Sequence, residues 1–168
     1  MRYLALFIFP FVLSSCLGKN KMQATVVEQA DEFGNFLKRK QYDKHISKMA
    51  HFVYANKEEK AQLKENLKAT DKYNAQRDAD LTKVSSLMNS EIFENKGYYQ
   101  CIIKQVRSYT NNFATVNSNF YLLAVSKDGV NWKFADITGL DIKIVGMVFK
   151  ELHPDLTVAL DEDDKLTR

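Results

Sequence analysis

The chain has 168 residues, 45% of them hydrophobic and 27% charged, and a formal net charge of +3 at pH 7. This length suits one domain with its own hydrophobic core, and no Gly- or Pro-rich linker or internal repeat divides it. Because the mild positive charge is not concentrated in one basic stripe, the sequence argues against a nucleic-acid partner.

The first fifteen residues predict export. Arg2 gives a positive start, residues 3–13 are apolar almost throughout, and the small residues Ser14 and Ser15 follow. This order is typical of a secretory signal peptide, and the apolar run is shorter than the roughly 20 residues that span a bilayer. The alternative is a buried N-terminal helix of the folded domain, which the lack of a polar face disfavours. We therefore expect residues 1–15 to be a signal peptide.

The apolar run ends in Leu13-Ser14-Ser15-Cys16, which resembles the bacterial lipobox, the cleavage site of lipoproteins. The resemblance implies that the Cys16 thiol receives a diacylglyceryl group and that cleavage makes Cys16 the new N-terminus. Two or more acyl chains give stable membrane anchoring, whereas one does not. The alternative is cleavage after a small residue, which would leave an ordinary secreted protein with an unmodified cysteine.

Residues 16–22 are interpreted as the lipidated cysteine and a short tether, which would reach about 20 Å if extended. Leu17, rather than Asp, follows the cysteine, which resembles lipoproteins that are not retained in the inner membrane. The expected location is therefore the bacterial cell envelope, and the outer membrane in a Gram-negative host. With Cys16 lipidated, Cys101 is the last free thiol, so no intramolecular disulfide is expected.

Three helices are predicted in the first half of the folded part, over residues 24–39, 43–54 and 57–72. Their apolar residues recur three and four positions apart, as on one face of an amphipathic helix. The third has only a thin apolar stripe among many charges, so we expect it to be largely exposed.

Strands are predicted after residue 80, over residues 83–93, 98–109, 114–126 and 132–138. Glycine marks two of the turns between them, at Gly97 and in Asp128-Gly129. Alternation along the strands would place Tyr99, Cys101 and Ile103 on one face, and we expect Tyr121 and Leu123 to join them. A short helix is predicted over residues 141–152, ended by Pro154, and residues 161–168 form an acidic tail.

Helices followed by an antiparallel meander indicate an α+β fold. Two stretches resemble the NTF2-like (cystatin-like) superfamily: residues 33–43, Phe-Gly-Asn-Phe-Leu-Lys-Arg-Lys-Gln-Tyr-Asp, and the hairpin of residues 121–134. The resemblance implies N-terminal helices packed on a curved antiparallel sheet, which together form a cone. The likeness spans roughly residues 24–138, and we expect residues 23–160 to form this domain.

Motifs for chemistry are scarce. His45 and His51, two of the three histidines, do not share a helix face, and no cysteine or carboxylate completes a metal site at useful spacing. The chain has no nucleophile elbow, phosphate loop or dinucleotide fingerprint, so we expect no metal and no cofactor. Cys101, in the middle of a strand, is interpreted as a small buried residue rather than a nucleophile.

The resemblance also implies a pocket inside the cone. The residues expected to line it are Phe36, Tyr54, Tyr99, Cys101, Tyr121, Trp132 and Phe134. The alternative for such aromatic residues is plain core. Asp43, His51 and Asp136 are candidate acid–base groups, although each fits a structural role equally well: a helix cap, a helix edge and a strand end.

The sequence thus predicts a lipid-anchored cell-envelope protein with a non-catalytic binding or accessory role. Its expected partners are the membrane, through the lipid anchor at Cys16, and a small hydrophobic ligand or an envelope protein. The alternative is a small-molecule lyase or isomerase that uses the cone pocket. A deep cavity holding an ionisable group with a shifted pKa would favour the enzyme, and a filled cone would favour the accessory protein. We expect residues 22–168 to have no acid–base catalysis of their own.

Overall fold

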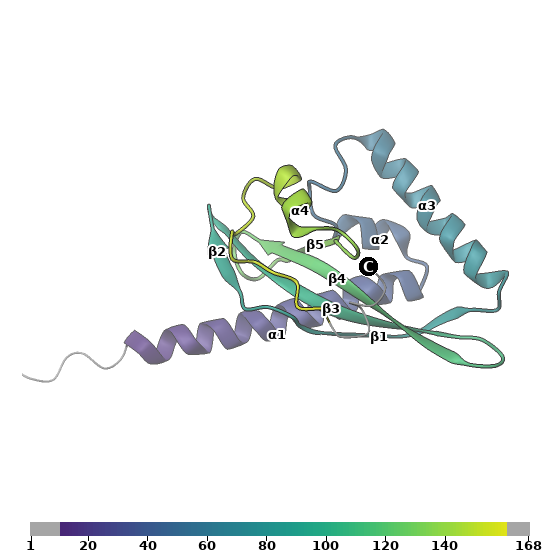
Figure 1. The fold of residues 1–168 in the computed structure, drawn as a ribbon, viewed down its shortest axis with the longest axis horizontal. Coiled ribbons are helices and arrows are strands. Elements are labelled where there is room, and N and C mark those ends of the chain that lie inside the picture. The colour runs from purple at the N-terminus through teal and green to yellow at the C-terminus, as the bar shows by residue number, and fades with distance from the viewer. Residues whose placement is uncertain (1–10, 161–168) are drawn as a thin grey trace, which may run out of the picture.

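The computed structural model describes residues 11–160, with side chains from residue 18 onwards (Figure 1). The chain is an α+β fold in which N-terminal helices pack against a curved, open antiparallel sheet. Most of the predicted signal peptide, the side chain of Cys16 and the acidic tail lie outside the described residues. No helix of the described part is long and apolar enough to cross a membrane.

Helix α1 (Phe11–Lys38) lies along one face of the sheet. It buries Val26, Ala30 and Phe33, which are spaced four and three residues apart on one side of the helix. The helix begins earlier than predicted, and the expected extended tether over residues 17–22 is helical instead. Extending an existing helix by a residue adds a hydrogen bond without a new nucleus, and Met22 already packs against the core.

Gly34 marks the closest approach of α1 to the sheet. A Cβ atom there would lie 2.6 Å from Cγ1 of Val84 and 2.8 Å from the amide of Gln105. The same Gln105 amide donates a hydrogen bond of 2.7 Å to the backbone oxygen of Ala30, so it has little room to move. The glycine therefore lets the helix backbone sit directly on the sheet.

We expect Gly34→Ala to lower the free energy of unfolding by about 1–3 kcal/mol through overpacking, although alanine is the better helix former. Urea titration of the full-length protein in non-ionic detergent measures this change. Gly18→Ala is the matched control on the same helix, because no atom lies within 4 Å of a Cβ there. Equal stability of the Gly34→Ala and wild-type proteins would contradict the close packing.

Helix α2 (Tyr42–Ser47) is shorter than the predicted helix over residues 43–54. The chain after it pairs with the outermost strand: the amide of Ala50 donates to the oxygen of Phe134 at 2.8 Å, and the amide of Phe134 donates to the oxygen of Lys48 at 2.9 Å. The predicted second helix is therefore wrong beyond residue 47, because pairing with a free strand edge outweighs the local apolar spacing.

Helix α3 (Lys57–Ala75) confirms the third predicted helix and its exposure, since it has no buried side chain. It begins with a reciprocal cap: Oδ1 of Asn56 accepts from the amide of Glu59, and the Glu59 carboxylate accepts from the amide of Ala55. Helix α4 (Ile142–Val148) is shorter than the predicted 141–152, and Asp141 caps its first turn.

The sheet has the order β1-β3-β4-β5, and all pairs are antiparallel. Its strands are β1 (Asp80–Met88), β2 (Phe93–Asn95), β3 (Tyr98–Thr110), β4 (Thr115–Ser126) and β5 (Lys133–Asp136). The predicted single strand 83–93 is two strands, β1 and β2, which both pair with β3. The turn between β2 and β3 is Lys96-Gly97, with φ of 49° and 77°, a positive-φ pair that suits a tight hairpin.

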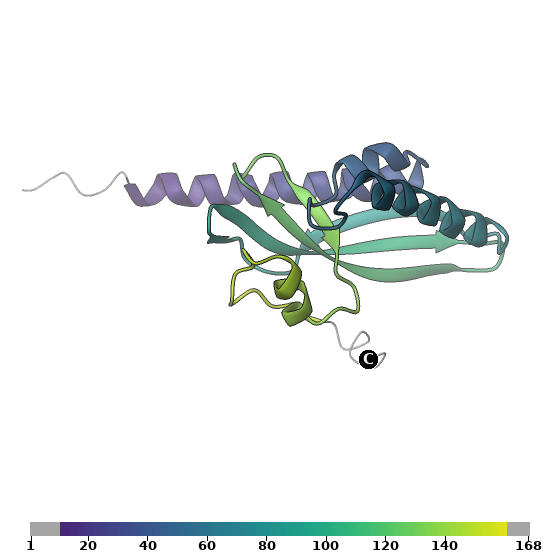
Figure 2. The same ribbon diagram turned by 90° about the horizontal axis from the view of Figure 1, so that it is seen from above.

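Helices lie on both faces of the sheet, α1 on one and α4 on the other (Figure 2). Cys101, Ile103, Leu122 and Ala124 face α1, together with Trp132 and Phe134. The opposite face buries Ile102, Tyr121, Leu123 and Val125. It packs against Phe149 at the end of α4 and Leu156 in the segment after it.

The expectation that Tyr121 and Leu123 share a face with Cys101 is wrong. In the register of β3 with β4, Cys101 lies opposite Ala124, and Ile103 lies opposite Leu122. Directly paired residues of antiparallel strands point to the same face, so Tyr121 and Leu123 point to the other one.

Candidate functional site

The residues expected to line a cone pocket mostly fill the interior instead. Cys101, Trp132 and Phe134 have no exposed surface, and Phe36 is buried beneath Arg39 and Lys44. The remaining three differ in their surroundings: Tyr99 packs partly buried against the same core, Tyr121 lies on the α4 face, and Tyr54 lines a surface cleft.

The interior does hold an ionisable side chain that sequence reasoning missed. His45 of α2 is 2% exposed, and its ring stacks on Phe33 with 3.9 Å between centroids. Its Nδ1 donates a hydrogen bond of 2.9 Å to the backbone oxygen of Phe33. Burial lowers the pKa of His45 to about 4, so the imidazole is neutral at neutral pH. The signal that could have found it is the helical spacing, since His45 stands next to Ile46 and four residues before Met49, on the apolar side of the predicted helix.

Arg107 of β3 is a second buried polar group, 6% exposed. Its Nε donates to Oε1 of Gln105 at 2.8 Å, and its guanidinium lies 3.8 Å from the Phe120 ring centroid. Arg107 lines a small cleft of about 100 Å³ under α3, together with Tyr42 and Asp71. The Tyr42 hydroxyl donates to Asp71, and burial together with this carboxylate raises the pKa of Tyr42 to about 12.

The three candidate acid–base groups are not assembled in one pocket. Asp43 is exposed and forms an ion pair of 2.7 Å with Lys64, which lowers the pKa of the carboxyl group. Asp136 ends β5, where its carboxylate accepts from the amide of Thr138. Only His51 lines the largest described cleft.

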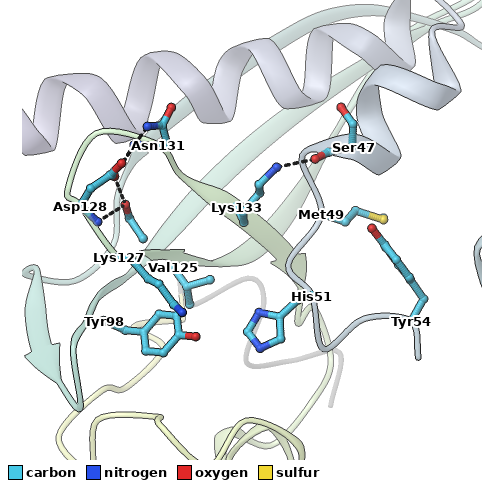
Figure 3. A pocket seen from close by; sticks show the side chains of 11 residues that line it. Ser47, Met49, His51, Tyr54, Tyr98, Val125, Lys127, Asp128, Asn131 and Lys133 are labelled. Atoms are coloured by element: carbon cyan, nitrogen blue, oxygen red, sulfur yellow. Dashed lines mark hydrogen bonds between the residues drawn. The ribbon is translucent and has the colours of Figure 1, made fainter. Parts of the chain in front are cut away.

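We call this cleft, of about 520 Å³, the aromatic cleft (Figure 3). It lies between the segment that follows α2 and the neighbouring ends of β3, β4 and β5. Its lining residues are Ser47, Met49, His51, Tyr54, Tyr98, Val125, Ser126, Lys127, Asp128, Asn131 and Lys133. The pairing of residues 48–50 with β5 brings the two sides together.

One wall of the aromatic cleft is the turn between β4 and β5, which Asp128 holds. Its carboxylate accepts from the amides of Val130 and Asn131, at 2.9 and 2.7 Å, and from the hydroxyl of Ser126 at 2.9 Å. The hydrogen bonds, those of Asn131 first, keep the pKa of Asp128 far below its usual value. The Asp128 carboxylate therefore stabilises the turn rather than serving as an acid or base.

Two aromatic rings stand side by side in the aromatic cleft (Figure 3). The rings of His51 and Tyr98 are 6.2 Å apart between centroids and 22° from parallel. Both meet the buried ring of Phe149 edge-on, at 76° and 85°. Phe149 thus packs perpendicular to both rings.

Two lysines complete the aromatic cleft. Nζ of Lys127 lies 5.2 Å from the centroid of Tyr98, and Nζ of Lys133 donates to the backbone oxygen of Ser47 at 2.5 Å. Burial, with the nearby charge of Lys48, lowers the pKa of Lys133. Within residues 18–160, no carboxylate lies within 4.0 Å of either ammonium group.

The described side chains include no group of three or more ligands that could hold a metal ion. Cys101 is buried, and burial raises the pKa of its thiol to about 12. The thiol therefore stays protonated at neutral pH, as the interpretation of a buried packing residue requires.

Comparison with known proteins adds no relative: no protein-family model, no curated protein and no solved structure matches the chain. The lipobox-like motif and the aromatic cleft are the features of the described chain that bear on its function.

Proposed function

We propose that this protein is a bacterial lipoprotein of the cell envelope, anchored through acyl chains on Cys16, with an NTF2-like domain in a non-catalytic binding role. The observation that carries the proposal is the lipobox-like Leu13-Ser14-Ser15-Cys16 at the end of an apolar run. In a Gram-negative host, Leu17 after the cysteine favours the outer membrane.

The course of α1 supports a domain held close to the membrane surface. The helix continues from Cys16 to Met22, which packs against the folded core. Six residues of helix span about 9 Å. Met22 meets the turn at Gly129, which adjoins the aromatic cleft, so this cleft would lie at the membrane-proximal end of the domain.

A binding role is favoured over catalysis for two reasons. Side chains fill the space between α1 and the sheet, and the aromatic cleft lies at the surface of the domain. A small-molecule lyase or isomerase is the second candidate. Its support is the buried His45, whose lowered pKa is typical of groups at functional sites. His45 lines none of the three described clefts.

Cys16→Ala should abolish lipid labelling and release the protein from the membrane fraction, because the acceptor thiol is lost. The measurement is incorporation of labelled palmitate in a bacterial host, followed by fractionation against inner- and outer-membrane markers. Ser15→Ala is the matched control, since it preserves the lipobox pattern and should keep both label and location. Palmitate incorporation into the Cys16→Ala protein would overturn the lipoprotein assignment, and co-fractionation with the inner membrane would contradict the outer-membrane location.

A further inference from the structure

We propose that the small cleft under α3 binds a small free carboxylate, with the anionic group on Arg107 and a short apolar part among leucine side chains. We call it the arginine cleft. The inference goes beyond the function proposed above, because it concerns a second cleft and does not depend on the lipid anchor.

Arg107 is a buried charge that lacks a close counter-ion. Only 6% of its surface is exposed, and a guanidinium group stays charged in proteins. Within residues 18–160, no carboxylate lies within 4.0 Å of it. Its contacts are with uncharged groups: it donates to Gln105 and to the Tyr109 oxygen, and it stacks on Phe120. Buried charges are normally paired, so a bound anion would complete this one.

Two carboxylates near Arg107 are engaged elsewhere. Asp71 lines the same cleft, but it accepts from the Tyr42 hydroxyl at 2.7 Å and pairs with Lys40 at 3.2 Å. Asp136 attracts Arg107 from beyond ion-pair distance, and its exposure to water weakens this attraction. Because Lys40 balances the charge of Asp71, the arginine cleft retains the positive charge of Arg107.

Arg107 is also held in a fixed position. Its partner Gln105 donates in turn to the backbone oxygen of Ala30 at 2.7 Å, and the guanidinium lies 3.8 Å from the Phe120 ring centroid. A donor fixed in this way loses little conformational freedom when a ligand binds. The neighbouring N–H groups of a guanidinium match the two oxygens of a carboxylate. This match favours a carboxylate over a spherical ion such as chloride.

The walls of the arginine cleft determine the rest of the ligand. Its apolar side chains are Leu37 of α1, Leu67 of α3 and Leu81 of β1. The Tyr109 hydroxyl and the Asn74 amide also line it, and both groups can donate to an anion. The volume of about 100 Å³ is the share of about three water molecules, at about 30 Å³ each. These walls fit an anion with a short apolar tail, such as acetate or propionate.

The test compares probes that separate the charge from the shape. Full-length protein in non-ionic detergent is titrated with acetate, propionate, acetamide and chloride, in buffer free of other small anions, and amide shifts in NMR spectra report the site. We expect acetate or propionate to saturate shifts around residues 67–74, 81 and 107–109, and to bind at least about tenfold more tightly than acetamide. Acetamide or chloride binding as tightly as the carboxylates, or shifts elsewhere, would overturn the proposal.

Variants then assign the contacts. Arg107→Gln should weaken propionate binding at least about tenfold, as expected for the loss of a charge-assisted contact. The fold should tolerate it, because the variant removes a buried charge without a close counter-ion. Leu67→Phe retains Arg107 and fills the cleft from α3, so it should also block propionate. Arg77→Gln is the matched control, an exposed arginine that does not line the cleft. Unchanged affinity in either cleft variant would sink the site.

A free acid and the carboxyl end of a longer chain share this chemistry. Figure 1 shows α3, which covers the cleft, at the end of the domain away from the N-terminal end of α1. The small volume favours the free acid, so propionate should bind more tightly than N-acetylglycine, which represents a chain end. The reverse order would assign the site to a chain end instead. Failure of both carboxylates would refute this inference and leave the lipoprotein assignment intact, because the Cys16→Ala fractionation does not depend on this cleft.

Discussion

Trp132→Ala should lower the free energy of unfolding by about 3–5 kcal/mol. The predicted burial of Trp132 is confirmed, since the side chain has no exposed surface and packs in the core between α1 and the sheet. Its backbone amide donates to the side chain of Gln29 on α1, at 3.1 Å. The substitution would leave a large cavity where β5 meets the first helix.

Trp132→Phe is the matched variant, and it should cost much less than Trp132→Ala. It retains most of the ring and removes the indole Nε1, a buried donor that has no partner among the described residues. Urea unfolding followed by far-UV circular dichroism measures both changes. A loss below about 1 kcal/mol for Trp132→Ala, far under the range for a buried tryptophan, together with the fluorescence of an exposed indole, would show that the ring faces solvent.

We expect the free energy of unfolding to fall by up to about 3 kcal/mol between pH 6.5 and pH 4 because of His45. The folded protein keeps the imidazole neutral down to a pKa of about 4, against 6.5 for the ordinary group. Between these values the unfolded chain binds more protons, so acid favours unfolding. Above pH 6.5 this contribution is constant.

The experiment compares urea unfolding at pH 7 and pH 4.5 in wild type and His45→Gln. Carboxylates contribute to acid unfolding in both proteins, so the difference between the two pH dependences isolates His45. His51→Gln, which retains His45, is the matched control. An unchanged pH dependence in His45→Gln would contradict the buried neutral imidazole. A His45 resonance that moves on addition of a small hydrophobic ligand would instead promote the lyase or isomerase alternative.

Elements defined by local pattern and turn chemistry were predictable from the sequence. The thin apolar stripe and the Asn56 cap specify α3, and Gly97 and Asp128-Gly129 end strands where they were expected to end. These features depend on residues a few positions apart, so periodicity and turn propensity suffice to find them. The order of helices before strands likewise gave the α+β class.

Features that depend on distant partners were not predictable in this way. The end of α2 was set by the pairing of residues 48–50 with β5, and the division of β1 from β2 by their separate pairing with β3. Local periodicity contains no information on a strand edge some 85 residues away. This edge determines where α2 ends, because its backbone N–H and C=O groups require hydrogen-bond partners.

The candidate site shows the same limit. Tyr99 was predicted from the sequence to line the pocket. The aromatic cleft is lined instead by its neighbour Tyr98, which points to the opposite face of β3. Central strands here are apolar on both faces, as in Cys101-Ile102-Ile103, so alternation alone does not say which face meets α1. The sequence therefore determined which residues are apolar and roughly where the long strands β3 and β4 lie. The register of β3 with β4, and the packing of helices on both faces of the sheet, decided which side chains became core and which line the surface cleft, because a strand buried on both sides carries no polar face to mark its orientation.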